Sequence, residues 1–198
     1  TPNYFINTKK NFNKEQLKRT IFLKKIKFPI VTKPINEGSS IGVKICRNFE
    51  HLYNKSNALF KQHLDLIYEP FIGGQEIQVA VLNNLPLGAI ELQPKRKFYD
   101  YKAKYSKSAK TAHIMPANLN KKKYIEVLKI AKKAHQVLGC RGITRSDFKF
   151  FNNKFYLLEL NTQPGMTNLS LVPEIASYKG ISFENLVEKI LRNASLNK

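Results

Sequence analysis

The sequence lacks tryptophan altogether and contains only two cysteines, Cys46 and Cys140, among its 198 residues. Two cysteines do not make the disulfide framework of a small secreted domain, and their spacing does not match a zinc site. The four histidines also lack the spacing that metal ligands usually show. We therefore expect two free thiols, buried in the core of a cytoplasmic protein.

Long hydrophobic runs are absent too, so we expect no transmembrane helix and no membrane partner. The N-terminus carries no secretory signal pattern, and the chain begins at Thr1 rather than at methionine. We therefore expect a processed form or a piece of a longer protein. A hydrophobic content of 42% with 24% charged residues is typical of a globular protein, and the length suits one large domain or two small ones.

Acidic residues are scarce: 14 aspartates and glutamates face 34 lysines and arginines, which gives a formal net charge of +20. Such a charge often indicates a nucleic-acid-binding protein. Here, however, lysine greatly outnumbers arginine, the residue on which base-specific contacts depend, and the lysines are spread along the whole chain. We therefore predict a solvated basic surface that attracts anionic substrates, and no nucleic-acid partner.

Hydrophobic periodicity and turn residues predict an alternation of strands and helices. The expected strands cover residues 1–8, 28–33, 41–46, 66–71, 75–82, 85–93, 140–151 and 154–161. The expected helices cover residues 13–25, 48–63, 121–138, 173–178 and 182–193. The break at Gly73-Gly74 predicts two subdomains, residues 1–74 and 75–198.

Local signals refine these elements. Asn13 and Asn48 are expected to cap the first two helices, and the pairs Asn83-Asn84 and Asn152-Asn153 are expected to form hairpin turns. One face of the helix at 121–138 is expected to point to the core. Its members are Ile125, Leu128, Ala131 and His135.

The segment Phe155–Thr167 carries the strongest chemical signal. Glu159 and Asn161 are two residues apart on a predicted strand, so they share a face, and Asp147 lies on the strand predicted to pair with it. Three such oxygen ligands suit a hard cation such as magnesium, which commonly bridges to phosphate. Arg145 could offset charge on a transferring phosphoryl group. The alternatives are an ordinary surface hairpin and an Arg145–Asp147 salt bridge.

Two further segments could act on a phosphorylated substrate. The loop Glu37–Ser40 follows the strand-borne Lys33, and its small residues would let backbone N–H groups approach a phosphate. An ordinary hairpin turn is the alternative. The long polar loop at 94–111 includes the aromatic run Phe98–Tyr105, which predicts either a lid that excludes water or an anchor to the core.

Together these segments resemble the central and C-terminal parts of the D-alanine–D-alanine ligases, a group of ATP-grasp carboxylate–amine ligases. The matching segments are PIVTKPINEGSSIGV, YEPFIGGQEIQVAVL, FYDYKAKY, GITRSDF and LELNTQPGMTNLSLVP, which occur in the family's order over nearly the whole chain. The resemblance implies an α+β, ATP-grasp fold in which two subdomains with antiparallel sheets enclose the nucleotide. It leaves out the family's N-terminal domain.

The resemblance also implies a role for individual residues. Those implied to bind ATP are Lys33, Ser39, Ser40, Glu69, Glu76 and Lys104. Those implied to hold two Mg²⁺ ions, with Mn²⁺ as an alternative, are Asp147, Glu159 and Asn161. Arg145 and the backbone at Gly165 would stabilise a tetrahedral intermediate, and Tyr105 would close against Ser39 over the substrate. Ser170 and Leu171 would receive the carboxylate of the second D-alanine.

The reaction implied by the resemblance joins two D-alanines for peptidoglycan precursor synthesis. ATP phosphorylates the first D-alanine, and the amine of the second attacks the acyl phosphate. The full-length protein would be a cytoplasmic homodimer. Two alternatives stay open: a related ligase with another acceptor such as D-lactate, and a catalytically silent basic fragment.

Overall fold

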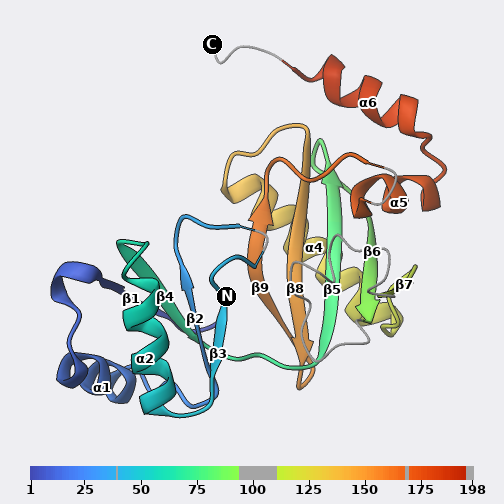
Figure 1. Cartoon of the computed structure of the whole chain (residues 1–198). Coiled ribbons are helices and arrows are strands. Elements are labelled where there is room, and N and C mark those ends of the chain that lie inside the picture. Colours follow the sequence, from blue (N-terminus) through green and yellow to red (C-terminus); the bar gives the residue numbers. More distant parts are fainter. Residues whose placement is uncertain (39, 94–110, 168–169, 195–198) are drawn as a thin grey trace. The chain divides into compact units, whose positions relative to one another are not determined.

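The computed structural model describes residues 1–38, 40–93, 111–167 and 170–194 (Figure 1). The chain divides into two compact units. Unit 1 contains residues 1–72, and the described part of unit 2 contains residues 73–93 and 111–194. Each unit combines an antiparallel sheet with helices, which confirms the expected α+β class.

Unit 1 is built on a four-stranded antiparallel sheet in the order β1-β4-β2-β3. Its strands are β1 (Phe5–Thr8), β2 (Ile30–Pro34), β3 (Lys44–Cys46) and β4 (Asp65–Pro70). Its helices are the 3₁₀ turn η1 (Lys9–Asn11), α1 (Lys14–Leu23) and α2 (Phe49–Leu59). The strands of the predicted hairpin at 28–46 do pair, but β3 is shorter than expected because residues 40–42 form a turn.

The two helices of unit 1 begin where the sequence predicts. The Asn13 Oδ1 accepts a hydrogen bond from the Gln16 backbone N–H at 2.8 Å, and the Asn48 Oδ1 accepts one from the His51 backbone N–H at 2.9 Å. These side chains satisfy backbone donors that have no partner inside the helix. The hydrophobic core then joins the helices to the sheet through Leu17, Leu52, Ile30, Leu66 and Tyr68, all of which are fully buried.

Unit 2 is built on a five-stranded antiparallel sheet in the order β7-β6-β5-β8-β9. Its strands are β5 (Gln75–Leu82), β6 (Leu85–Gln93), β7 (Ala112–Ile114), β8 (Ile143–Phe151) and β9 (Lys154–Asn161). Its helices are α4 (Lys121–Val137), α5 (Leu171–Tyr178) and α6 (Phe183–Arg192). The pairs Asn83-Asn84 and Asn152-Asn153 adopt positive φ angles at the two hairpin turns, as predicted.

Helix α4 covers one face of the unit 2 sheet (Figure 1). Its buried row is Val127, Ala131 and His135. Val127 and Ala131 share a hydrophobic cluster with Ile77, Val79 and Phe148 of the sheet, and His135 contacts Thr144 of β8. The predicted row was partly wrong, because Ile125 is 43% exposed. The sequence expectation also missed β7, a three-residue edge strand that pairs only with β6 among the described strands.

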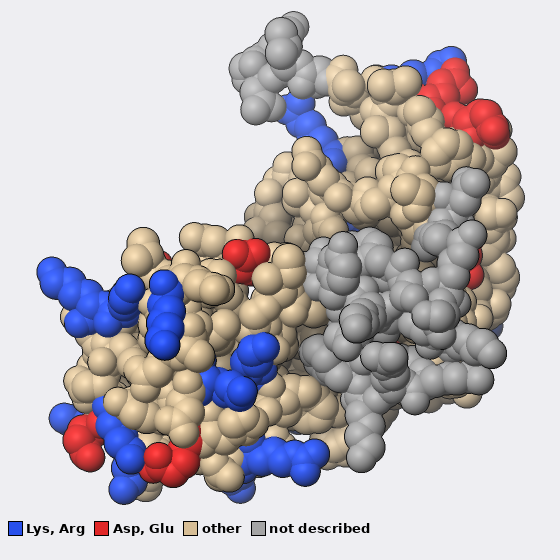
Figure 2. Space-filling view, viewed as in Figure 1, with Lys and Arg blue, Asp and Glu red and all other residues tan. Residues whose placement is uncertain are grey.

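Three expectations about the surface and the thiols can be compared with the structure. Both cysteines are free; Cys46 is buried, whereas Cys140 is only half-buried, so burial was predicted correctly for the first alone. Figure 2 shows the basic side chains of unit 1 scattered over the visible face rather than gathered into one patch. Among the helices described, none has both the length and the apolar character needed to cross a bilayer.

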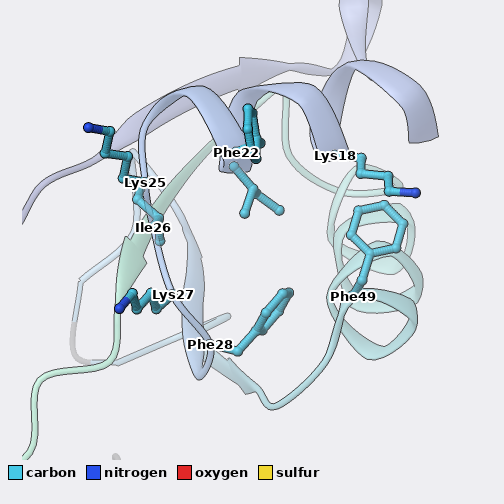
Figure 3. A pocket seen from close by; sticks show the side chains of 8 residues that line it. Lys18, Phe22, Lys25, Ile26, Lys27, Phe28 and Phe49 are labelled. Atoms are coloured by element: carbon cyan, nitrogen blue, oxygen red, sulfur yellow. The ribbon is translucent and has the colours of Figure 1, made fainter.

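Unit 1 also contains a groove of about 570 Å³ beside α1 (Figure 3). It is lined by Lys18, Ile21, Phe22, Lys25, Ile26, Lys27, Phe28 and Phe49. None of the residues predicted to bind substrate or metal lines it, so the candidate site has to be built from the sheets instead.

Candidate functional site

The face of the unit 2 sheet opposite α4 gathers the residues predicted to carry the chemistry. In β8, Arg145 and Asp147 alternate with core-facing residues. On the neighbouring strand β9, Asn161 lies directly opposite Arg145, and Glu159 lies directly opposite Asp147. Residues directly opposite in an antiparallel pair point to the same side of the sheet. The structure therefore brings Arg145, Asp147, Glu159 and Asn161 onto one face of one hairpin.

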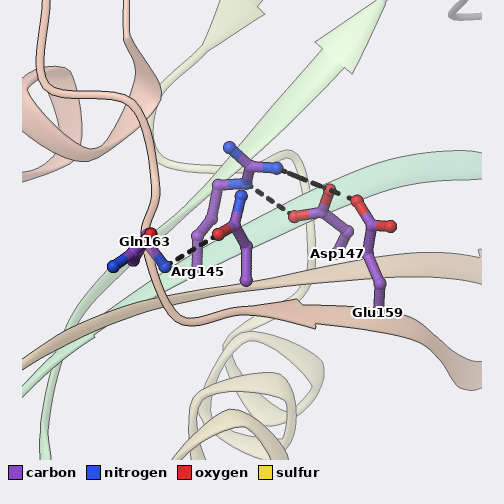
Figure 4. Close-up of polar contacts among 5 residues, drawn as sticks. Arg145, Asp147, Glu159 and Gln163 are labelled. Atoms are coloured by element: carbon purple, nitrogen blue, oxygen red, sulfur yellow. Dashed lines mark hydrogen bonds and ion pairs between the residues drawn. The ribbon is translucent and has the colours of Figure 1, made fainter. Parts of the chain in front are cut away.

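Arg145 is held by two carboxylates. Its Nε lies 2.7 Å from the Asp147 Oδ1 and its Nη2 lies 2.9 Å from the Asp147 Oδ2, which makes a bidentate pair. The Nη2 is also 4.0 Å from the Glu159 Oε1, and Figure 4 shows the guanidinium pointing toward both acids. The salt-bridge alternative is thus present. An ionised carboxylate offers about four lone-pair sites, so a bond to Arg145 does not by itself exclude a metal ion.

The oxygen atoms of this face are of the kinds that a magnesium ion binds. Asp147 is only 5% exposed, whereas the Glu159 side chain is half exposed, so one donor is fixed by its surroundings and another is open to solvent. The Asn161 Oδ1 accepts a hydrogen bond from the Gln163 backbone N–H at 2.9 Å, which sets the direction of its carboxamide. Two carboxylates and a carboxamide are the ligand types that hard cations prefer.

A second ion pair lies on the same face, one step along the strands. The Lys149 Nζ donates to the Glu76 Oε2 at 2.9 Å, and the two residues are directly opposite each other on β8 and β5. Glu76 was predicted from the sequence, whereas Lys149 was missed. Its position two residues after Asp147 on the same strand is the signal that could have found it.

In unit 1, two predicted residues form a close pair of their own. The Lys33 Nζ donates to the Glu69 Oε1 at 2.7 Å. Glu69 lies directly opposite Val31, so it shares the face of β2 on which Lys33, two residues further, also lies. Glu69 is 7% exposed and Lys33 is half-buried. This burial and the bond between the two side chains restrict their motion.

The glycine-serine loop after β2 is described only in part. The Ile41 N–H donates to the Gly38 carbonyl at 2.9 Å, and Ser40 has a φ of 63°. A tight turn therefore follows Lys33. Ser39 lies outside the described residues, as do Lys104, Tyr105 and the whole run Phe98–Tyr105.

Described residues between β9 and α5 make close contacts at Gly165, Thr167 and Ser170. The Ser170 Oγ accepts a hydrogen bond from the Thr167 N–H at 3.0 Å and lies 2.9 Å from the Thr167 Oγ1. A Cβ atom at Gly165 would lie 2.8 Å from the Ser170 Oγ. Leu171 begins α5 and is buried, so the two residues predicted to receive a carboxylate lie at a helix N-terminus.

Sequence relatives align with most or all of the chain. It is 55% identical over 199 residues to a D-alanine–D-alanine ligase of Pelagibacter ubique, with 100% of this chain and 64% of the relative aligned. It is 46% identical over 169 residues to a D-alanine–D-alanine ligase of Geotalea uraniireducens, with 85% of this chain and 54% of the relative aligned. The chain therefore spans less than two thirds of the length of these relatives.

Solved structures agree. The chain is similar to the Bacillus anthracis D-alanine–D-alanine ligase complexed with ATP, at a TM-score of 0.79 and 28% identity, covering 98% of this chain and 60% of that one. It is similar to the VanG D-Ala:D-Ser ligase of Enterococcus faecalis, at a TM-score of 0.83 and 26% identity, covering 97% of this chain and 56% of that one. The family model for the D-ala D-ala ligase C-terminus matches residues 1–192. The chain therefore belongs to the D-ala D-ala ligase C-terminus family and has the ATP-grasp fold of these ligases.

Proposed function

We propose that this chain carries the nucleotide, metal and acceptor sites of an ATP-dependent D-alanine–D-alanine ligase. The observation that supports this most directly is the single sheet face that holds Arg145, Asp147, Glu159 and Asn161 in a protein of this family. A face with two carboxylates, a carboxamide and a guanidinium suits a phosphorylated substrate that carries a divalent cation.

Under this proposal charged side chains of the two ion pairs contact the nucleotide. Lys33, with Ser39, Ser40 and Lys104, contacts the ATP phosphates, where cations offset the phosphate charge. Glu69 lies beside the adenine and Glu76 accepts hydrogen bonds from the ribose hydroxyls. The ion pairs Lys33–Glu69 and Lys149–Glu76 order three of these side chains, Lys33, Glu69 and Glu76, before ATP binds, which reduces the entropy cost of binding.

Asp147, Glu159 and Asn161 would hold Mg²⁺, with Mn²⁺ as a substitute. The ions, when bound, neutralise phosphate charge and polarise the phosphoryl group. Arg145, fixed by Asp147 at 2.7 Å, supplies a positive charge whose position does not depend on the substrate. Preorganised charge of this kind stabilises a transition state because it needs little rearrangement during the reaction.

The chemistry proceeds through an acyl phosphate. A carboxylate is a poor electrophile, so one carboxylate oxygen of the first D-alanine attacks the γ-phosphorus and ADP leaves. The amine of the second D-alanine then attacks the acyl carbon, loses a proton and displaces inorganic phosphate. Arg145 and the Gly165 backbone stabilise the tetrahedral intermediate, and closure of Tyr105 against Ser39 excludes the water that would hydrolyse the acyl phosphate.

The second D-alanine would place its carboxylate at Ser170 and Leu171. Ser170 is the N-cap of α5 and its side chain does not cap the helix, so backbone donors of the first turn are available to an anion. An acceptor other than D-alanine is the second candidate, because the chain is also similar to a D-Ala:D-Ser ligase. D-lactate is a further acceptor to be compared. We also propose that the full-length protein works as a homodimer in the cytoplasm.

The test is phosphate release by the full-length protein with ATP, magnesium and D-alanine, followed by product analysis. We expect D-alanyl-D-alanine and one phosphate per dipeptide. D-serine and D-lactate, offered in competition at neutral pH, separate the candidate acceptors. Absence of turnover with all three acceptors, in a protein that binds ATP, would contradict the proposed function.

A further inference from the structure

Gln78 is a buried carboxamide on the same sheet face as the candidate site. It lies in β5 directly opposite Asp147 of β8, and it is two residues after Glu76. Because opposite residues share a face, its side chain projects on the side of Asp147 and Glu76 rather than toward α4. The side chain is 1% exposed.

The Gln78 Oε1 has no hydrogen-bond partner among the residues that the structure describes. Two charged donors of this face are engaged elsewhere, since Arg145 bonds Asp147 and Lys149 bonds Glu76. A buried amide oxygen without a donor is unfavourable, because it has lost its hydrogen bonds to water and no protein group replaces them. Buried polar groups in folded proteins are therefore nearly always satisfied by protein, water or ligand.

Another glutamine of the same strand provides a contrast. Gln75 is three residues before Gln78 on β5, so its side chain lies on the other face of the sheet. Its Nε2 donates to the Glu91 Oε2 at 3.1 Å and to the Asn118 carbonyl at 3.2 Å. The protein thus provides acceptors for the amide nitrogen of the glutamine that faces away from the candidate site. The amide with an open acceptor is the one that faces it.

We infer that Gln78 is a further ligand-binding residue of this site, whose Oε1 accepts a hydrogen bond from an O–H group of bound Mg·ATP. The inference rests on the proposed function. Its position between Glu76 and Asp147 offers two sources for the O–H group: a ribose hydroxyl, or a water molecule of the magnesium hydration shell, which Mg²⁺ retains when it binds proteins.

The test compares Gln78→Met with the wild-type complete chain. Methionine keeps the length of the side chain and removes the carboxamide. We expect the melting temperature without ligand to be unchanged or raised, and the dissociation constant of Mg·ATP, measured by calorimetry, to rise about tenfold. Gln75→Met is the matched control: it should lower the melting temperature and leave nucleotide affinity unchanged.

Binding measurements with different ligands identify the O–H donor. If the loss of affinity persists with ATP in EDTA and vanishes with 2′-deoxy-ATP, the ribose is the partner. If it requires magnesium, a metal-bound water is the partner. Unchanged affinity in every arm, while Asp147→Asn weakens Mg·ATP binding, overturns the inference and leaves the proposed function standing. Absence of ATP binding by the wild-type chain overturns both.

Discussion

Lys149 and Glu76 face each other directly across β8 and β5, with 2.9 Å between the ammonium nitrogen and a carboxylate oxygen. Their side chains are 17% and 14% exposed, so solvent screens this pair less than it screens a surface pair. The lysine thereby orients the carboxylate that we assign to the ribose. The pair adds a residue to the site that no sequence motif had indicated.

Loss of Lys149 should destabilise the protein through its partner. In Lys149→Met the mostly buried Glu76 carboxylate loses its hydrogen bond to the Lys149 ammonium, and we expect the free energy of unfolding to fall by about 2 kcal/mol in urea titrations. The double variant with Glu76→Gln should recover part of this loss. Lys154→Met, at an exposed position of β9, is the control and should change little. An equal fall in the free energy of unfolding in the single and double variants would show that the Lys149–Glu76 pair does not contribute to stability.

Glu159→Gln should separate metal binding from folding. The side chain is half exposed, so we expect a melting temperature close to that of the wild type. The gain in ATP affinity on adding magnesium, measured by calorimetry, should fall at least tenfold because a charged ligand is lost. Glu188→Gln, in the exposed pair with Arg192 on α6, should leave that gain unchanged. An unchanged gain in Glu159→Gln would remove this residue from the metal site.

Gly165→Ala should affect the acceptor more than ATP. The new Cβ would lie 2.8 Å from the Ser170 Oγ, so this hydroxyl, which bonds Thr167, must shift. We expect a severalfold rise in the KM for the second D-alanine in steady-state assays of the full-length protein, with ATP affinity unchanged. Gly73→Ala, whose nearest neighbour would be 3.9 Å away, is the control. Equal effects of both variants on the KM would argue against the proposed acceptor position.

The stability of unit 1 should fall in alkaline solution because of Tyr68. Burial raises the pKa of this phenol to about 12 from a usual value of 10.0. Between pH 10 and 12 the unfolded chain releases this proton while the folded chain keeps it, so ionisation favours unfolding. Two pKa units correspond to about 2.7 kcal/mol. Urea titrations over this range should show a smaller decline in the free energy of unfolding for Tyr68→Phe than for the wild type. Equal declines would contradict the raised pKa of Tyr68.

The opposite pH dependence is expected for His135 in unit 2. Burial lowers the pKa of this imidazole from 6.5, and its Nδ1 lies 2.8 Å from the Thr144 Oγ1. As the pH falls below 6.5 the unfolded chain binds a proton that the folded chain resists, so stability decreases. His135→Gln removes the titrating group, and its urea midpoint should change less between pH 7.5 and 5.5. A wild-type midpoint that is constant over this range would contradict the prediction.

Much of the fold could be predicted because it depends on local signals. Asn13 and Asn48 cap helices by bonding backbone donors three residues ahead, and paired asparagines tolerate the positive φ of tight hairpins. The face of α4 was predicted less well. Several residues of that helix could have faced the sheet, and only the packing places Val127 inward and Ile125 in solvent.

Sequence alone determined the family, the order of most elements and the shared face of Glu159 and Asn161, because side chains two residues apart on one strand point to the same side. The structure decided that Asp147 lies opposite Glu159, since the register of this hairpin shifts between Asp147 and Phe148. Tertiary structure decided which partner each charge has. Lys33 with Glu69, Lys149 with Glu76 and the open Oε1 of Gln78 depend on the register between strands that are far apart in the chain. Register follows from packing of whole sheet faces, so no local stretch of sequence contains it.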